Sequence, residues 1–212
     1  MRFRAVASSL LVAVGWGGAW ATPAWAGQPP SRKGFWMSFG LGYGSAHAAC
    51  EQCPSGDRVG SVSGAIRLGG TLGPHWLLGW EGSGWLQNNA TGWLPEYGGA
   101  DRTLGNSMVV ALFYPRSTSG FFVRGGAGLS YAGFSYGDCV GDSCYTYDAA
   151  NGVGFGASVA IGYDLRIRPN KSLTPELVYA RGFPRDLTDT GRTVATNWSH
   201  DYWAVNLCFT IH

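Results

Sequence analysis

The feature that most constrains this chain is an alternation of apolar and small residues with a period of two. From Met37 to Tyr43 every second residue is apolar, and serine or glycine stands between. The same pattern runs for longer from Val153 to Ile167. A period of two is typical of a β-strand whose two faces meet different surroundings. The chain is therefore predicted to be all-β.

The alternation recurs along the chain and predicts eight strands, the number and spacing of an up-and-down barrel. These lie at residues 35–43, 62–72, 76–83, 104–114, 121–131, 153–167, 173–179 and 203–211. Three connections are short (73–75, 115–119 and 169–171), and four are long (46–59, 87–102, 133–150 and 181–200). Short turns on one side and long loops on the other are typical of outer-membrane barrels. We therefore expect an eight-stranded antiparallel transmembrane β-barrel over 34–212.

A soluble barrel with its apolar face inside is the alternative. Its outer face would need many charged side chains, yet only 13% of the residues are charged and 34 are glycine. Small residues fit a narrow lumen better than a solvated surface, so we expect the apolar face, including Val110, to face lipid. Two aromatic girdles are also expected. They comprise Phe35, Trp76, Tyr114, Phe121 and Phe209 near the turns, and Tyr43, Tyr131, Phe155, Tyr179 and Trp203 near the loops.

The first 26 residues are typical of a secretory signal peptide. Arg2 and Arg4 precede an apolar stretch, and Ala24-Trp25-Ala26 is a small-x-small cleavage site. We expect cleavage before Gly27, leaving 27–33 as a periplasmic N-terminal segment.

The expected topology assigns each charged residue to the lumen, the turns or the loops. Residues 27–212 contain 13 basic and 13 acidic residues. Six are expected to form ion pairs in the lumen: Arg67, Glu81, Arg124, Asp164, Arg166 and Glu176. Arg67 and Glu81 each lie seven residues from Pro74, so they should reach the same depth on neighbouring strands.

The turns carry only basic residues and the loops a net charge of −5. Acidic loops exclude a nucleic-acid binder and disfavour other polyanions. Eight strands leave a lumen that side chains can fill, which disfavours a general porin.

At this point the chain resembles the small eight-stranded outer-membrane β-barrel proteins, the OmpA-like transmembrane and OmpX/OmpW-like group. The resemblance rests on Leu78–Gly82, Phe122–Gly128, Leu173–Leu177 and the C-terminal strand. It implies a bacterial outer-membrane location, contact with outer-membrane lipid and lipopolysaccharide, and a monomer. It also implies that the barrel-assembly machinery reads the last strand, although the aromatic Phe209 stands three residues before the end.

Four cysteines lie in expected loops, Cys50 and Cys53 in the first and Cys139 and Cys144 in the third. An oxidising compartment favours disulfides, and three pairings are possible. One bridge within each loop is the simplest, and cross-pairing is a second possibility. The rival is a zinc site with His47, but the spacing is not a standard one. Cys208 should be a thiol facing the lumen.

The only constellation that suggests catalysis is Asn197–Asp201, because some barrels of this size modify lipid A. Neighbours on a strand point to opposite faces, so Ser199 and His200 should not form a nucleophile–base pair. We therefore expect a non-enzymatic protein without a cofactor or metal. Its role would be envelope-structural or surface interaction through the loops. A narrow OmpW-like channel for small apolar compounds is the alternative, and a lipid A-modifying hydrolase a third possibility.

Overall fold

The fold is seen in a computed structural model, which describes residues 32–53, 57–88, 93–140 and 143–212. The expected signal peptide lies outside the described residues. The elements, in chain order, are β1 (Phe35–Ala49), β2 (Val59–Thr71), β3 (Trp76–Gln87), the 3₁₀ turn η1 (Pro95–Tyr97), β4 (Asp101–Phe113), β5 (Phe121–Val140), β6 (Ser143–Tyr163), β7 (Leu165–Arg168), β8 (Lys171–Asp189) and β9 (Arg192–Ile211). None of the described residues belongs to a helix long and apolar enough to cross a membrane.

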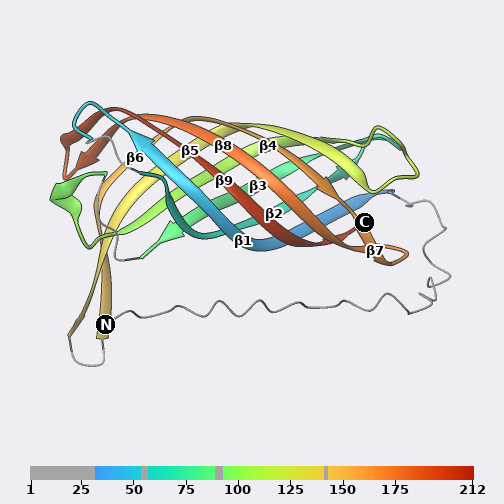
Figure 1. The fold of residues 1–212 in the computed structure, drawn as a ribbon, viewed down its shortest axis with the longest axis horizontal. Coiled ribbons are helices and arrows are strands. Elements are labelled where there is room, and N and C mark those ends of the chain that lie inside the picture. Colours follow the sequence, from blue (N-terminus) through green and yellow to red (C-terminus); the bar gives the residue numbers. More distant parts are fainter. Residues whose placement is uncertain (1–31, 54–56, 89–92, 141–142) are drawn as a thin grey trace, which may run out of the picture.

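The strands form a closed antiparallel barrel, which confirms the predicted fold class (Figure 1). Consecutive strands pair from β1 to β6 and from β7 to β9. β6 pairs with β8 rather than with β7, and β1 pairs with β9 to close the ring. The short β7 continues the course of β6 after a break at Asp164. The wall therefore has eight strand positions, which we call staves. The sixth stave consists of β6 and β7 and is broken near its turn.

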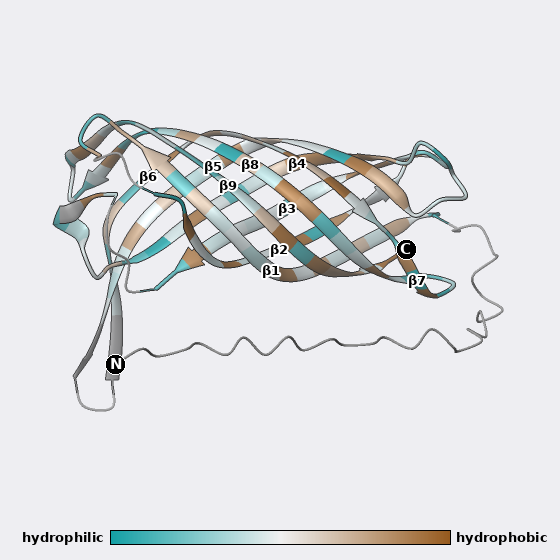
Figure 2. Cartoon of the chain, in the orientation of Figure 1, coloured by the Kyte–Doolittle hydropathy of each residue, from teal (hydrophilic) through white to brown (hydrophobic). Residues whose placement is uncertain are grey.

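The outer surface of the barrel is apolar, as a membrane-facing wall requires. Figure 2 shows apolar residues along the strands and hydrophilic colour at the hairpin ends. Large apolar side chains that remain exposed include Leu41, Val109, Val159 and Leu207, all more than half accessible. A band of this kind in contact with water would be strongly unfavourable, so its natural surroundings are lipid.

The fourth strand faces the opposite way from our expectation. Val110 and Tyr114 are 0% and 1% exposed and lie inside the barrel, whereas Val109 is 63% exposed and faces out. The register pairs Met108 with Glu81, which fixes this orientation, since paired residues share a face. The turn-side lumen holds an apolar cluster that includes Trp36, and the large residues of β4 fill it. Because β4 has large apolar residues on one face and small ones on the other, with no charge at mid-strand, its pattern alone did not reveal the inner face.

Two of the four expected loops are strand hairpins instead. Residues 133–150 continue β5 and β6 as far as the pair Val140 and Ser143. Residues 181–200 likewise continue β8 and β9 to the pair Asp189 and Arg192. The end of the β5–β6 hairpin bends away from the barrel, at the lower left of Figure 1. The many turn-forming residues in these two ranges predict loops. Strands that extend beyond the membrane can pair through their backbones without an alternation of apolar residues, so the sequence pattern did not reveal them.

The corrected orientation of β4 predicts a depth-dependent cost of charge on its outer face. Val109→Arg should lower the free energy of unfolding by about 2–4 kcal/mol, because Val109 faces lipid near mid-strand. Thr103→Arg, on the same face near the extracellular end, should cost about 0–1 kcal/mol. Urea unfolding in liposomes measures both. Equal costs would show that the depth assignment is wrong.

Candidate functional site

The centre of the lumen is occupied by four charged side chains in an alternating square. Arg67 on β2 and Arg124 on β5 lie between Glu81 on β3 and Glu176 on β8. Arg67 approaches the two carboxylates at 2.5 Å each, and Arg124 approaches Glu81 at 2.7 Å and Glu176 at 3.2 Å. Each charge thus has two opposite charges beside it.

The square is fully removed from solvent. Its four side chains are at most 3% exposed. Each carboxylate presents a single oxygen to both arginines, while Glu81 Oε1 and Glu176 Oε2 have no hydrogen-bond partner within the described part of the chain. Arginine is suited to this role because its planar guanidinium can meet two acceptors at once. Loss of one carboxylate would leave a buried cation undercompensated.

The other two residues of the expected lumen cluster lie outside the square, towards the turn end of the barrel. Asp164 sits at the turn end, where it accepts hydrogen bonds from Tyr114 at 2.9 Å and Thr174 at 2.8 Å. Arg166 is partly exposed on β7, after the break in the sixth stave. Arg166 lies two residues beyond Asp164, closer to the turn, and is therefore not part of the square.

Arg32 closes the turn end of the barrel. Its guanidinium lies 3.5 Å from the centre of the Tyr114 ring and 3.7 Å from Asp164. It also donates hydrogen bonds to the carbonyls of Ser117 and Ser119. Arg32 belongs to the expected periplasmic N-terminal segment, and its side chain is 1% exposed. The chain just before β1 is thereby fastened at the barrel end through Arg32.

Above the square, uncharged polar groups continue the filling of the lumen. Tyr202 accepts a hydrogen bond from Asn106 at 3.1 Å and lies 3.4 Å from Ser83. Ser63 donates to Asn206 at 2.7 Å. Buried polar groups paired in this way link strands that are far apart in the sequence across the lumen.

A buried serine–histidine contact lies one layer further out. Ser130 Oγ is 3.1 Å from His200 Nε2, and Trp198 Nε1 donates to His200 Nδ1 at 3.2 Å. Because Nδ1 accepts that bond, the neutral ring carries its proton on Nε2 and donates it to the serine. A general base needs the reverse polarity. The contact is therefore a structural hydrogen bond, and Ser199 is partly exposed while His200 is buried.

The extracellular mouth is filled by aromatic rings. Trp93, from the segment before η1, packs against Trp85 at 5.9 Å and Trp198 at 6.1 Å between ring centres. Phe134 contacts Trp198 edge-on at 5.8 Å. The Arg102 guanidinium lies 4.6 Å above Trp93, a cation–π arrangement. We name these five residues the aromatic plug.

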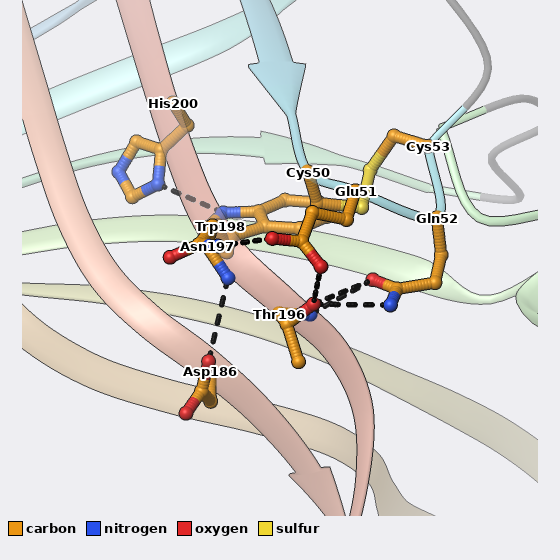
Figure 3. The surroundings of a disulfide bond; sticks show 9 residues. All are labelled: Cys50, Glu51, Gln52, Cys53, Asp186, Thr196, Asn197, Trp198 and His200. Carbon is orange, nitrogen blue, oxygen red and sulfur yellow. Dashed lines mark hydrogen bonds between the residues drawn. A yellow bond between two sulfur atoms is a disulfide. The ribbon is translucent and has the colours of Figure 1, made fainter.

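The first loop is fastened to β9 by a disulfide-bridged turn (Figure 3). Cys50 and Cys53 form a disulfide, the simplest of the pairings that the sequence allows. Between them, Glu51 accepts hydrogen bonds from the side chains of Thr196 and Asn197. These bonds lower the pKa of Glu51, so its contacts persist until the pH falls through that lowered value.

The same turn supports an irregularity in β9. Asn197 has a positive φ of 54°, a conformation that is uncommon for residues other than glycine but is tolerated by asparagine more than by most. Across it, Ala195 and Trp198 both point into the barrel although they are three positions apart. This irregularity turns Trp198 inward, into the aromatic plug. In the sequence, the only sign of the irregularity is the polar stretch around Asn197.

The second cysteine pair is placed only by its backbone. Cys139 and Cys144 lie opposite each other in the β5–β6 ladder, and their side chains lie outside the described residues. Cys208 is the buried lumen thiol expected from the sequence, 3.8 Å from Arg67. In the described ranges no group of three potential ligands could hold a metal.

A closed barrel of eight antiparallel staves with an apolar exterior and a filled lumen is the architecture of small outer-membrane β-barrel proteins. No protein-family model matches the chain, and no curated protein matches its sequence. Solved structures do match. Neisserial surface protein A is 14% identical, with a TM-score of 0.53 over 84% of this chain and 97% of that one.

Two further solved structures also match. The attachment invasion locus protein of Yersinia pestis, in complex with the heparin analogue sucrose octasulfate, is 9% identical with a TM-score of 0.47, covering 84% and 99% of the two chains. OprG from Pseudomonas aeruginosa is 11% identical with a TM-score of 0.44, covering 88% and 99%. At these identities the likeness concerns the fold alone, and it agrees with the resemblance noted in the sequence and with a bacterial outer-membrane location.

The square predicts an asymmetry between single and double substitutions. Glu81→Gln should lower the free energy of unfolding by about 3 kcal/mol, because it leaves Arg67 and Arg124 to share one carboxylate. The double change Arg67→Met with Glu81→Leu should be milder. Urea unfolding of the folded barrel measures the effect.

Glu96→Gln is the matched control for this experiment, since Glu96 is exposed in η1. It should change stability by less than about 0.5 kcal/mol. A neutral Glu81→Gln would mean that the centre of the lumen is hydrated.

Proposed function

We propose that this protein is a non-enzymatic outer-membrane barrel whose role is surface interaction through its extracellular hairpins. The membrane-spanning part serves as a rigid, sealed support. The observation that carries the proposal is the extension of the β5–β6 hairpin beyond its neighbours.

This hairpin has two free edges. β4 stops pairing with β5 at Ser135, and the pairing of β8 with β6 ends at Asn151. Beyond these points β5 and β6 pair only with each other among the described strands, up to Val140 and Ser143. Unpaired backbone groups along such an edge are a template for an added strand. Tyr147, 56% exposed, adds an aromatic surface of the kind enriched at interfaces.

The filled lumen supports a mechanical rather than a conducting role. The path is blocked at the turn end by Arg32, at the centre by the square and at the mouth by the aromatic plug. The alternative, a narrow channel for small apolar compounds, would require several of these layers to move. A lipid A-modifying activity has less support, because His200 is oriented as a donor to Ser130.

We extend the proposal to the partners expected from the resemblance. The barrel would act as a monomer in contact with outer-membrane lipid and lipopolysaccharide. Assembly machinery would recognise β9, where Phe209 packs beside Phe39 with ring centres 5.5 Å apart.

Conductance tests the sealed barrel. The protein in planar bilayers should give no discrete single-channel steps, because each layer of the lumen is packed. Trp93→Ala should also remain silent, since the square still blocks the path. Steps that change with Glu81→Gln would instead favour the narrow channel.

Removal of the projecting hairpin tests the interaction role. Replacing residues 136–147 with Asn-Gly should abolish most adhesion of expressing cells to protein-coated surfaces and leave the barrel intact, because the deleted residues lie beyond the pairing of β4 and β8. Adhesion counts and heat-modifiable migration measure the two properties.

The control shortens the β8–β9 hairpin by replacing residues 188–193 with the same turn. This variant should adhere normally. Equal adhesion by the wild type and both variants would contradict a role for the β5–β6 hairpin.

A further inference from the structure

The two ends of the barrel carry opposite charge. The extracellular end has ten acidic and five basic residues in the sequence. The turn end, which faces the periplasm in this fold, has one acidic residue, Asp164, and six basic ones: Arg32, Lys33, Arg116, Arg166, Arg168 and Lys171. The proposed surface interaction uses the first end and leaves the second unexplained.

The carboxylate of Asp164 does not neutralise the surface of this end. It is buried and contacts Arg32, His212, Tyr114 and Thr174. It is the only aspartate or glutamate side chain among the described residues at the turns. The exposed basic side chains therefore create a positive rim, which attracts anions.

A hollow in this rim combines charge with unused hydrogen-bond donors. It has a volume of about 340 Å³ and lies between the N-terminal segment and the β2–β3 turn, where Arg32, Lys33, Thr71 and Pro74 line it. Arg32 Nε and Thr71 Oγ1 are buried and have no hydrogen-bond partner in the described ranges. Lys33 is exposed beside them.

The Arg32 side chain is held in a fixed position beside this hollow. Its terminal nitrogens are engaged with Ser117 and Ser119, and its guanidinium is stacked on Tyr114. A ligand at Nε would therefore meet an ordered donor and incur little additional entropy loss.

The hollow lies at the boundary of the membrane. Phe35 follows Lys33 by two residues and is 64% exposed, and Trp76 stands just after the β2–β3 turn and is 49% exposed. Aromatic rings in such positions mark the level of lipid headgroups. An anion that fits here is thus one carried by the bilayer.

We propose that this hollow binds the phosphate of an anionic phospholipid in the periplasmic leaflet. A phosphodiester offers several acceptor oxygens to the Arg32 Nε–H, the Thr71 hydroxyl and the Lys33 ammonium, and its charge offsets the positive rim. The acyl chains would lie against the apolar wall beside Phe35. The site is independent of the extracellular hairpins.

Native mass spectrometry of the detergent-solubilised protein tests this site. Phosphatidylglycerol should be retained over phosphatidylcholine of the same chain length. Lys33→Gln should weaken phosphatidylglycerol binding about fivefold, the factor equivalent to about 1 kcal/mol per basic side chain at an anionic surface. Thr71→Val should weaken it about tenfold, as expected for loss of a hydrogen bond to a charged group.

Arg192→Gln is the charge-matched control, because it removes one positive charge at the opposite end of the barrel. It should leave binding unchanged, and heat-modifiable migration should show that all variants are folded. Equal retention of the two lipids, or equal losses in Lys33→Gln and Arg192→Gln, would overturn the proposal. Displacement of phosphatidylglycerol by excess inorganic phosphate would also overturn it, by identifying a free-anion site.

Discussion

The structure depends on the neutralisation of four buried charges at the centre of the barrel. Four different strands, β2, β3, β5 and β8, contribute Arg67, Glu81, Arg124 and Glu176, which meet at the centre of the lumen. A closed barrel of this size must fill its interior, and charge placed there must be compensated internally. The square satisfies both requirements and divides the lumen into a turn half, lined by Trp36, Leu77 and Phe122, and a mouth half closed by the aromatic plug. The function that we propose follows from this division, because a sealed support leaves the extracellular hairpins as the surface open to partners.

The sequence predicted the elements in which physical alternation is strong. From Met37 to Tyr43 in β1 and from Val153 to Tyr163 in β6, large apolar residues face lipid and small ones face the lumen, so the inner and outer faces are evident. The depth of Arg67 and Glu81 could be derived as well, because a turn of three residues leaves little freedom in the register, and the two are direct partners in the ladder. The prediction of which face of β4 points inward was wrong, because the alternation of residue size does not identify the inner face of this strand. The lumen below the square is apolar, so Val110 fits inside while Ser107 and Gly105 face out.

Most of the extracellular end could not be predicted from local pattern. Trp93, Trp198 and Arg102 converge in the aromatic plug through contacts between residues far apart in the chain. The composition of 87–102 and 181–200 indicates polar loops. It contains no signal that Trp93 enters the mouth or that residues 181–200 continue as strands. Arg32 was similarly hidden: the sequence shows a basic terminal segment, and only the closed barrel shows Tyr114 and Asp164 beneath it.

The distribution of the square over the wall also has a consequence for the order of assembly. Glu176 on β8 and Arg67 on β2 meet across the lumen, so their pairing requires the sheet to curl until its late and early staves face each other. An open sheet in the bilayer would carry these side chains toward lipid, where an uncompensated charge costs several kcal/mol. Partly formed sheets are therefore penalised, while closure between β1 and β9 removes the penalty in a single event. The charges thereby favour the closed barrel over a partly formed sheet. A chain in which β8 has not yet been added would lack Glu176, one of the two carboxylates that compensate Arg67 and Arg124.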